Sequence, residues 1–364
     1  MQYIFTLLFI GINLIGFSQS FSLDNFLSNN EELDRKVDSI FHNLNAHDRV
    51  SQLIMPAVGR YGSPEDTIKA LIREKKIGGV LLLNGTTDQF KNWTSEYNEM
   101  NVELNALPFL YSADAEPSLV NRKMMGSRAV PKANQIVSHE QLIETATIIS
   151  EDLNDVGINY NFAPVVDVAK NKTVGYRGFG SKPENILPFS EAFIQTTQEH
   201  NIIATAKHFP GHGLVSGDTH KSLQVIDGDL KELENYPPLI EAGVLSIMVA
   251  HIAIKNNDSY NTEGFPATLS ESVVSHLLRD SLGFEGLIVT DALNMGGVVH
   301  FEDVSIKAVD AGCDILLMPV SASKSHAELL KKYNEEQGFQ EKVNTSCKRI
   351  IRMKVCLGLI DSED

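Results

Sequence analysis

Residues 202–213 read IIATAKHFPGHG, and this stretch decides the fold. Its first part, Ile202–Ala206, is a short and mostly apolar run with the length of a buried β-strand. Lys207 and His208 follow at once, so titratable side chains stand where the predicted strand ends. Strands that are apolar throughout and end in polar residues are typical of parallel α/β sheets with a site at their carboxyl ends.

The same rhythm of a short apolar run, a turn and a longer amphipathic stretch repeats along the chain. Eight runs predict strands: Gln52–Val58, Gly79–Leu83, Pro108–Ser112, Ile158–Phe162, Ile202–Ala206, Ser246–Ala250, Leu287–Thr290 and Asp314–Met318. Helical periodicity marks four of the longer stretches: Glu140–Asn154, Leu187–His200, Leu230–Ala242 and Ser270–Ser281. Strands that alternate with helices imply a parallel sheet covered by helices. We therefore expect a single (β/α)8 TIM-type barrel, formed by one domain over residues 21–364.

The first twenty residues contain no charged side chain. An apolar run from Tyr3 to Phe17 is followed by Ser18-Gln19-Ser20, which is typical of a signal peptide, residues 1–20, cleaved after Ser20. The run is also close to the length of a membrane-spanning helix, so an uncleaved anchor is the alternative. We expect a secreted or periplasmic protein.

The amino-acid composition limits the kinds of molecule that the protein is expected to bind. The formal net charge is −16, with 47 Asp and Glu against 31 Lys and Arg, so phosphate-rich partners are repelled. We expect a monomer with no nucleic-acid partner, and no stable membrane partner unless residues 1–20 are retained. The three cysteines are an odd number and predict no complete disulfide framework.

Polar residues gather at the predicted strand ends. Asp114 follows the third strand, Lys207-His208 the fifth, His251 the sixth and Asp291 the seventh. Active sites of α/β barrels form at the carboxyl ends of the strands. The sequence therefore predicts one site at this face of the sheet.

The loop after the fifth strand carries the densest chemistry, with three histidines, one Lys and one Asp between residues 207 and 220. Asp218 and His220 are two residues apart, which in extended backbone sends both side chains to the same side. A carboxylate bonded to one ring nitrogen would orient His220 and leave the other nitrogen to act as an acid or base. Two alternatives remain: a solvated polar loop, and a metal site from His208, His212, Asp218 and His220.

Asp291 ends the seventh apolar strand, in LIVTDALNM, where burying a carboxylate is costly unless it is paired or used. Beside the histidine loop we interpret it as a nucleophile, with a helix N-cap as the alternative.

Three further residues are candidates for binding a substrate. Arg177 lies in the glycine-rich stretch GYRGFG and can fork onto a carboxylate or onto hydroxyls, although a surface Arg that braces a loop is the plainer reading. Asp114 could accept from two vicinal hydroxyls, and Arg122 follows it in the same loop. Glu116 is interpreted only as a charge at a helix N-terminus.

These segments together resemble glycoside hydrolase family 3, specifically the bacterial β-N-acetylglucosaminidases of the NagZ type, from about residue 45 to residue 355. The motif KHFPGHG followed by D-x-H resembles that subgroup's Asp–His dyad, here Asp218 and His220. VTDALNM resembles the nucleophile segment, which places Asp291 in that role. The substrate-binding positions of the family correspond to Asp114, Arg122, Arg177, Lys207 and His208.

The resemblance implies a retaining double displacement on terminal β-linked N-acetylglucosamine, from peptidoglycan fragments or chitooligosaccharides. Asp291 would form the glycosyl-enzyme, while His220 would protonate the leaving oxygen and then activate water. It also implies a small carbohydrate as the partner, with no metal and no cofactor.

The sequence departs from the family pattern after Asp114. The family commonly has D-x-E-G-G-R, whereas this chain has Asp114-Ala115-Glu116-Pro117-Ser118-Leu119, which changes the loop near the sugar. Ala292 and Asn294 replace a common Asp and Ser, although neither is chemically required. Three alternatives stay open: phosphorolysis by the same residues, a metal-dependent barrel hydrolase, and a non-catalytic sugar-binding barrel.

Overall fold

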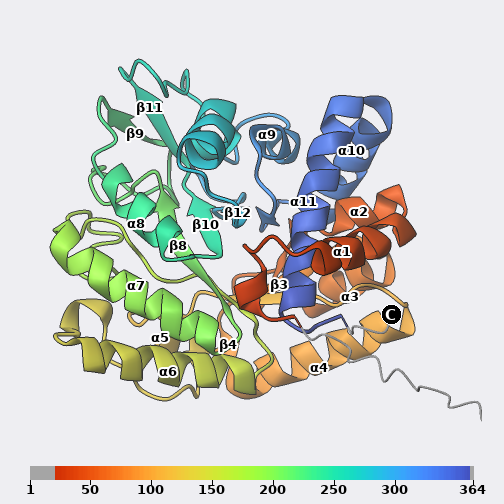
Figure 1. Cartoon of the computed structure of the whole chain (residues 1–364), viewed down its shortest axis with the longest axis horizontal. Helices are drawn as coiled ribbons and strands as arrows, with labels where there is room; N and C mark the ends of the chain where they lie inside the picture. The colour runs from red at the N-terminus through yellow and green to blue at the C-terminus, as the bar shows by residue number, and fades with distance from the viewer. Residues whose placement is uncertain (1–20, 361–364) are drawn as a thin grey trace, which may run out of the picture.

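The computed structural model describes residues 21–360, and the predicted signal peptide lies outside them. A parallel sheet occupies the centre and helices cover it (Figure 1). Seven strands pair in the order β12-β10-β8-β7-β5-β3-β2. In chain order they are β2 (Ala57–Val58), β3 (Gly79–Leu82), β5 (Leu110–Ala113), β7 (Tyr160–Asn161), β8 (Ile203–Phe209), β10 (Ser246–Val249) and β12 (Leu287–Thr290). Each falls on or within a segment predicted from apolar runs, apart from short extensions of β5 and β8.

The predicted closed eight-stranded barrel is wrong, because over residues 21–360 the central sheet pairs these seven strands and no eighth. The outer segments β1 (Ile54–Met55) and β13 (Leu316–Leu317) pair with each other in a separate two-stranded sheet. Pro56 has no N–H to donate and stands between β1 and β2, so the first predicted strand is split. Between β12 and the segment before β13 there is an isolated bridge from Val289 to Ile315. The fold is α/β, with a seven-stranded parallel half-barrel sheet covered by helices (Figure 1).

Strand β8 extends past the predicted run and includes Lys207 and His208, all of it buried. Its pairing with β10 shifts register between Met248 and Val249, which pair with Lys207 and Phe209, so His208 is left without a ladder partner. Such a bulge redirects a side chain at the end of a strand.

Helices pack on the outside of the sheet (Figure 1). The α-helices are α1 (Glu31–Asn43), α2 (Ala46–Ser51), α3 (Glu65–Arg73), α4 (Thr87–Glu103), α5 (Val120–Lys123), α6 (His139–Asp155), α7 (Pro183–Glu199), α8 (Tyr236–Glu241), α9 (Val304–Ala311), α10 (Ala322–Glu335) and α11 (Gln337–Cys356). Segment η5 (Ser272–Ser281) is a π-helix, and short 3-10 turns are η1 (Leu23–Asn25), η2 (Ala133–Gln135), η3 (Leu233–Asn235) and η4 (Ala267–Leu269). Side-chain caps explain several starts: Asn30 accepts from the first turn of α1, and Ser138 from that of α6.

The two ends of the described chain meet, because α1 packs beside α11 (Figure 1). On α11, Lys354 is fully buried and donates to the side-chain oxygen of Gln52 at 2.6 Å and the carbonyl of Gly78 at 3.0 Å. The three cysteines are free and buried.

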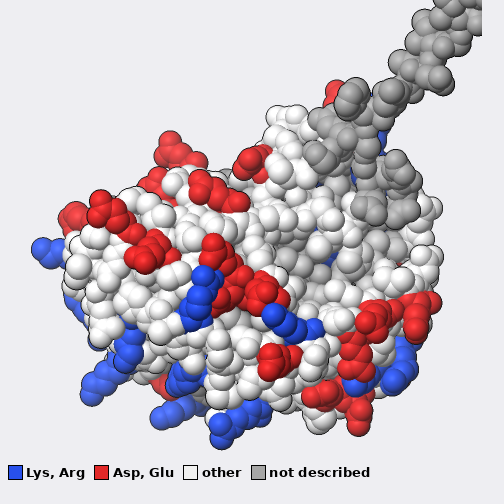
Figure 2. Space-filling model, turned by 90° about the horizontal axis from the view of Figure 1, so that it is seen from below, with Lys and Arg blue, Asp and Glu red and all other residues white. Residues whose placement is uncertain are grey.

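Two short parallel pairs lie outside the main sheet: β9 (Gln224–Asp227) with β11 (Ile252–Lys255), and β4 (Gly85–Thr86) with β6 (Met124–Met125). The surface seen in Figure 2 mixes acidic and basic side chains. Over residues 21–360, no helix has both the length and the apolar character needed to cross a membrane.

Candidate active site

Asp218 and His220 are in contact in the loop that follows β8. Oδ1 of Asp218 lies 2.7 Å from Nδ1 of His220 and accepts from its backbone N–H at 3.0 Å. Burial acts to raise the pKa of Asp218, but the bonds from the His220 ring and amide outweigh it and the pKa is lowered. An ionised carboxylate only accepts, so the proton of the pair sits on Nδ1 and leaves Nε2 to take up or release a second proton. The ring is largely exposed, as a group that meets a substrate must be.

Asp291 stands directly after β12 and is fixed through its backbone. Its N–H donates to the carbonyl of Val249 at 2.9 Å, and its Oδ1 accepts from the N–H of Ala292 at 2.7 Å. Helix α9 begins only at Val304, after Asp303 at its N-cap, so the N-cap alternative for Asp291 does not apply.

Electrostatic influence from three histidines favours the ionised form of Asp291. Burial acts to raise the pKa of Asp291, but His208, His251, His220 and the Ala292 amide outweigh it, and the pKa lies below its ordinary value. The carboxylate is therefore an anion at neutral pH, as a nucleophile must be.

His251 holds the segment after Asp291 in place. It is fully buried, and its Nε2 lies 2.9 Å from the Ala292 carbonyl, which can only accept. The proton is therefore on Nε2, and Nδ1 accepts from the hydroxyl of Thr268 at 2.8 Å. Burial lowers the pKa of His251, in keeping with a neutral ring.

The loops that carry the two predicted catalytic residues are joined by backbone hydrogen bonds. Gly296 donates to the carbonyl of His220 at 3.0 Å, and Gly297 to that of Thr219 at 2.9 Å. A Cβ added at Gly296 would lie 2.3 Å from the Lys221 carbonyl oxygen, so only glycine permits this approach. The Asp291 segment and the His220 loop thus form one assembly.

A buried charge network lies at the ends of β5 and β8. Lys207 Nζ is 2.9 Å from Asp114 Oδ1 and 2.8 Å from Glu116 Oε1. Arg177 forks onto Glu116, with Nε to Oε2 at 2.8 Å and Nη2 to Oε1 at 2.5 Å. Burial acts to raise the pKa of Glu116, but Arg177 and Lys207 lower it to about 2. The network fixes the part-exposed carboxylate of Asp114 as an acceptor for hydroxyls.

Two neighbours of this network differ in their surroundings from what the sequence suggested. Lys123 contacts Asp114 Oδ2 at 2.5 Å, whereas the adjacent Arg122, predicted to bind substrate, is exposed. Glu116 is not a helix-terminal charge, because α5 starts at Val120 and the Glu116 side chain is fully buried between cations. The sequence could have indicated that Glu116 lies beside Asp114, because the two are separated by two positions and alternate residues in extended backbone share a side.

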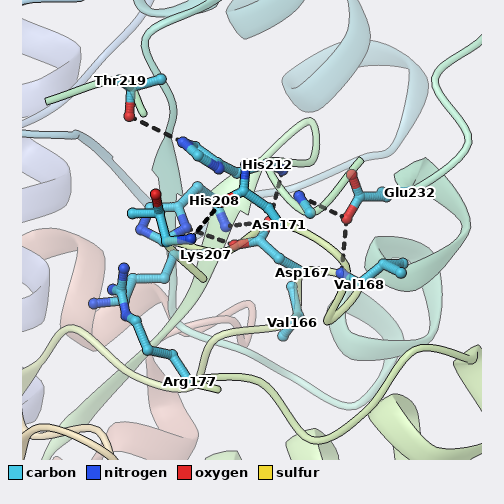
Figure 3. Close-up of polar contacts among 12 residues, drawn as sticks. Val166, Asp167, Val168, Asn171, Arg177, Lys207, His208, His212, Thr219 and Glu232 are labelled. Carbon is cyan, nitrogen blue, oxygen red and sulfur yellow. Dashed lines mark hydrogen bonds and ion pairs between the residues drawn. The ribbon is translucent and has the colours of Figure 1, made fainter. Parts of the chain in front are cut away.

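Asp167 is a residue that the sequence reasoning missed. Its Oδ2 is 2.7 Å from Nδ1 of His208, and its Oδ1 accepts from the backbone N–H groups of His208 at 3.2 Å and His212 at 2.8 Å (Figure 3). Nε2 of His212 lies 3.0 Å from the hydroxyl of Thr219. The sequence could have pointed to Asp167 through its position in FAPVVDV, just after the fourth predicted strand. Asp167 orients His208 toward the site.

The alternative of a metal site in the histidine loop would require several ligand side chains to converge on one point. Over residues 21–360, no group of three or more His, Cys, Asp or Glu side chains is arranged to hold a metal ion. His208 and His220 instead bond to different carboxylates, Asp167 and Asp218.

A comparison with protein-family models identifies the family to which this chain belongs. Residues 46–353 match the glycosyl hydrolase family 3 N terminal domain. The chain belongs to glycosyl hydrolase family 3. The resemblance to glycoside hydrolase family 3 that the sequence showed is therefore confirmed.

The chain is also similar to curated proteins that are named β-hexosaminidases. The chain is 29% identical over 333 residues to "Beta-hexosaminidase A" of Pseudoalteromonas piscicida, covering 80% of this chain and 55% of the relative. It is 34% identical over 229 residues to a "Beta-hexosaminidase" of Actinobacillus pleuropneumoniae, covering 58% and 65%. It therefore spans less than two thirds of the length of these curated relatives.

Solved structures of family 3 proteins share the fold. A β-N-acetylglucosaminidase from Paenibacillus superposes with a TM-score of 0.78 at 29% identity, covering 87% of this chain and 63% of that one. A β-N-acetylhexosaminidase from Beutenbergia cavernae gives a TM-score of 0.77 at 26% identity, covering 85% and 98%.

Proposed function

We propose that this family 3 protein is a retaining exo-β-N-acetylglucosaminidase that acts on peptidoglycan fragments or chitooligosaccharides. One observation carries the proposal: the Asp218–His220 pair sits on a loop that is hydrogen-bonded to the segment of Asp291. This arrangement supplies an anion and an oriented acid/base within one assembly. The hexosaminidase names of its relatives support the choice of sugar.

In the first step, Asp291 attacks the anomeric carbon and forms a glycosyl-enzyme. His220 gives the proton on Nε2 to the glycosidic oxygen as the bond to the leaving group breaks. The resulting ring is neutral: Nε2 carries no proton, and the N–H of Nδ1 still donates to the Asp218 carboxylate. In the second step His220 takes a proton from water, which attacks the same carbon and releases Asp291.

The charge network supports binding of the sugar that is cleaved. Asp114 offers a carboxylate to vicinal hydroxyls, while Lys207 and Arg177 are held by Glu116. Asp167 keeps His208 in a fixed tautomer, with Nδ1–H on the carboxylate and Nε2 available to the substrate. Substrate positioning of this kind lowers the entropic cost of reaching the transition state.

The test is a panel of chromogenic β-glycosides assayed with wild type, Asp291→Ala and His220→Ala. We expect activity on the N-acetylglucosaminide and a loss of roughly 1,000-fold or more in Asp291→Ala. Asp280→Ala, at an exposed position on η5, is the matched control and should behave as wild type.

Three results would contradict the proposal: equal rates on the β-glucoside, an unimpaired Asp291→Ala, or a glycosyl-1-phosphate product when phosphate is present. The last would favour phosphorolysis, since a histidine acid/base repels phosphate less than a carboxylate does.

We also propose that residues 1–20 direct export of the protein and are removed. Sequencing the N-terminus of the protein recovered outside the cytoplasm should give Phe21 as the first residue, and recovery of an intact Met1 in the membrane fraction would favour the anchor.

A further inference from the structure

Glu232 is a buried carboxylate that no step of the proposed mechanism uses. It stands just before η3 and is 3% exposed. Its Oε1 accepts from the backbone N–H of Val168 at 2.7 Å (Figure 3). Oε1 also accepts from the N–H of Gly213 at 3.1 Å, and Oε2 accepts from that of Leu214 at 2.9 Å. All three donors are backbone groups of segments that form the site.

The two segments come from different parts of the chain. Val168 follows Asp167, which holds His208 and the His212 amide. Gly213 and Leu214 begin the stretch that leads to Asp218 and His220. One carboxylate therefore ties the acid/base loop to the segment that orients His208.

The two glycines of the KHFPGHG motif allow the loop to approach Glu232 closely. A Cβ at Gly211, whose φ is +134°, would lie 2.5 Å from the Cβ of Glu232. A Cβ at Gly213 would lie 2.6 Å from Glu232 Oε1 and 2.0 Å from the Val168 carbonyl oxygen. Any side chain at either position would push the loop off Glu232.

The surroundings of Glu232 make it costly to bury. Burial and the charge of Asp167 raise its pKa to about 7, although the three amides act in the opposite direction. Glu232 also lines a cavity of about 510 Å³ with Lys170, Lys231, Asp227 and Asp229. Within residues 21–360, the hydrogen bonds to this buried carboxylate all come from backbone N–H groups of the site, which points to a role in that site.

We propose that Glu232 is a positioning residue for general acid catalysis: it holds the loop so that His220 meets the glycosidic oxygen of the substrate. This inference rests on the proposed function. If it holds, weakening the contact will impair bond cleavage where the leaving group needs a proton. A leaving group that departs as a stable phenolate needs none, and its cleavage will be largely spared.

The experiment compares Glu232→Gln with Glu234→Gln, an exposed glutamate two positions away. Gln keeps one acceptor oxygen and presents an NH₂ where the second oxygen faced a backbone N–H. We measure kcat/KM on methyl and on 2,4-dinitrophenyl β-N-acetylglucosaminide. Glu232→Gln should lose about 10-fold or more on the methyl glycoside and less than about 3-fold on the dinitrophenyl glycoside, because general acid catalysis is worth at least this much. Equal losses on the two substrates, or none, would overturn the inference.

Hydrogen exchange separates this inference from the function on which it rests. The amides of Val168, Gly213 and Leu214 should exchange faster in Glu232→Gln than in wild type, without any substrate. Unchanged exchange in an active enzyme would overturn the inference alone, whereas a wild type inactive on both substrates would overturn the proposed function and the catalytic role together. Should Glu232→Gln fail to fold, Glu232→Asp, which keeps the charge on a shorter arm, must show the same selective loss or the inference falls.

Discussion

At the scale of single residues, the site is built on carboxylates that act in pairs with cations or imidazoles. Asp218 orients His220, Asp167 orients His208, and Glu116 neutralises Lys207 and Arg177. Glu116 and Asp167, the two fully buried carboxylates of these three, have partners with good geometry, which offsets the cost of removing their charge from water. Among residues 21–360, Asp291 has no cationic partner within hydrogen-bonding distance, and it is the carboxylate to which we assign the attack.

Adjacent cations near Asp114 give a matched pair of variants. Lys123→Met should lower kcat/KM by about 10-fold, since it removes a hydrogen bond to a charged group worth roughly 1.5–3 kcal/mol. Arg122→Met, at the neighbouring exposed position, should change it by less than about 2-fold. Steady-state kinetics on the N-acetylglucosaminide checks both. A larger loss in Arg122→Met would favour the assignment implied by the family resemblance over the contact in the structure.

At the scale of elements, the features that could be predicted from the sequence were those that depend on the local pattern of apolar and polar residues. Apolar runs located the strands, and polar residues at their ends located Asp114, His208 and Asp291 on one face. The closed barrel could not be judged from such runs, because pairing depends on partners distant in sequence and on Pro56 within the first run. The roles of Lys123 and Glu232 depend on tertiary approach, which spacing alone does not reveal.

The loop after β8 provides a test at this scale. Gly213→Ala should abolish most activity, because its Cβ would lie 2.0 Å from the Val168 carbonyl oxygen and backbone would have to move. Gly338→Ala is the control: nothing lies within 4 Å, and alanine in α11 should raise the free energy of unfolding by up to about 1 kcal/mol. Urea unfolding and the same glycosidase assay measure both. Full activity in Gly213→Ala would contradict the close approach described here.

At the scale of the whole molecule, Lys354 joins the end of the fold to its beginning. It reaches from α11 to Gln52 and Gly78, and no carboxylate among residues 21–360 pairs with it. Burial lowers its pKa to about 7, from an ordinary value of 10.5. Between these two values the unfolded chain binds a proton that the folded protein does not, so this group makes stability rise with pH.

The consequence is measurable as a difference between two proteins. The free energy of unfolding of wild type, minus that of Lys354→Met, should rise by up to about 1.4 kcal/mol per pH unit between pH 7 and pH 10. Lys348→Met, on the exposed side of the same helix, should show no such slope. Urea titrations across this pH range test the prediction. A difference that stays flat or falls with pH would show that Lys354 is charged in the folded protein.

The most direct measurement for the account as a whole is the identification of the residue that carries the sugar during turnover. A 5-fluoro N-acetylglucosaminyl fluoride slows release of the glycosyl-enzyme, so the adduct can be digested and located by mass spectrometry. The account predicts one sugar per protein, on Asp291, and none in Asp291→Ala. An adduct on Asp167, Glu232 or another carboxylate, or a product of inverted anomeric configuration with no adduct, would contradict it.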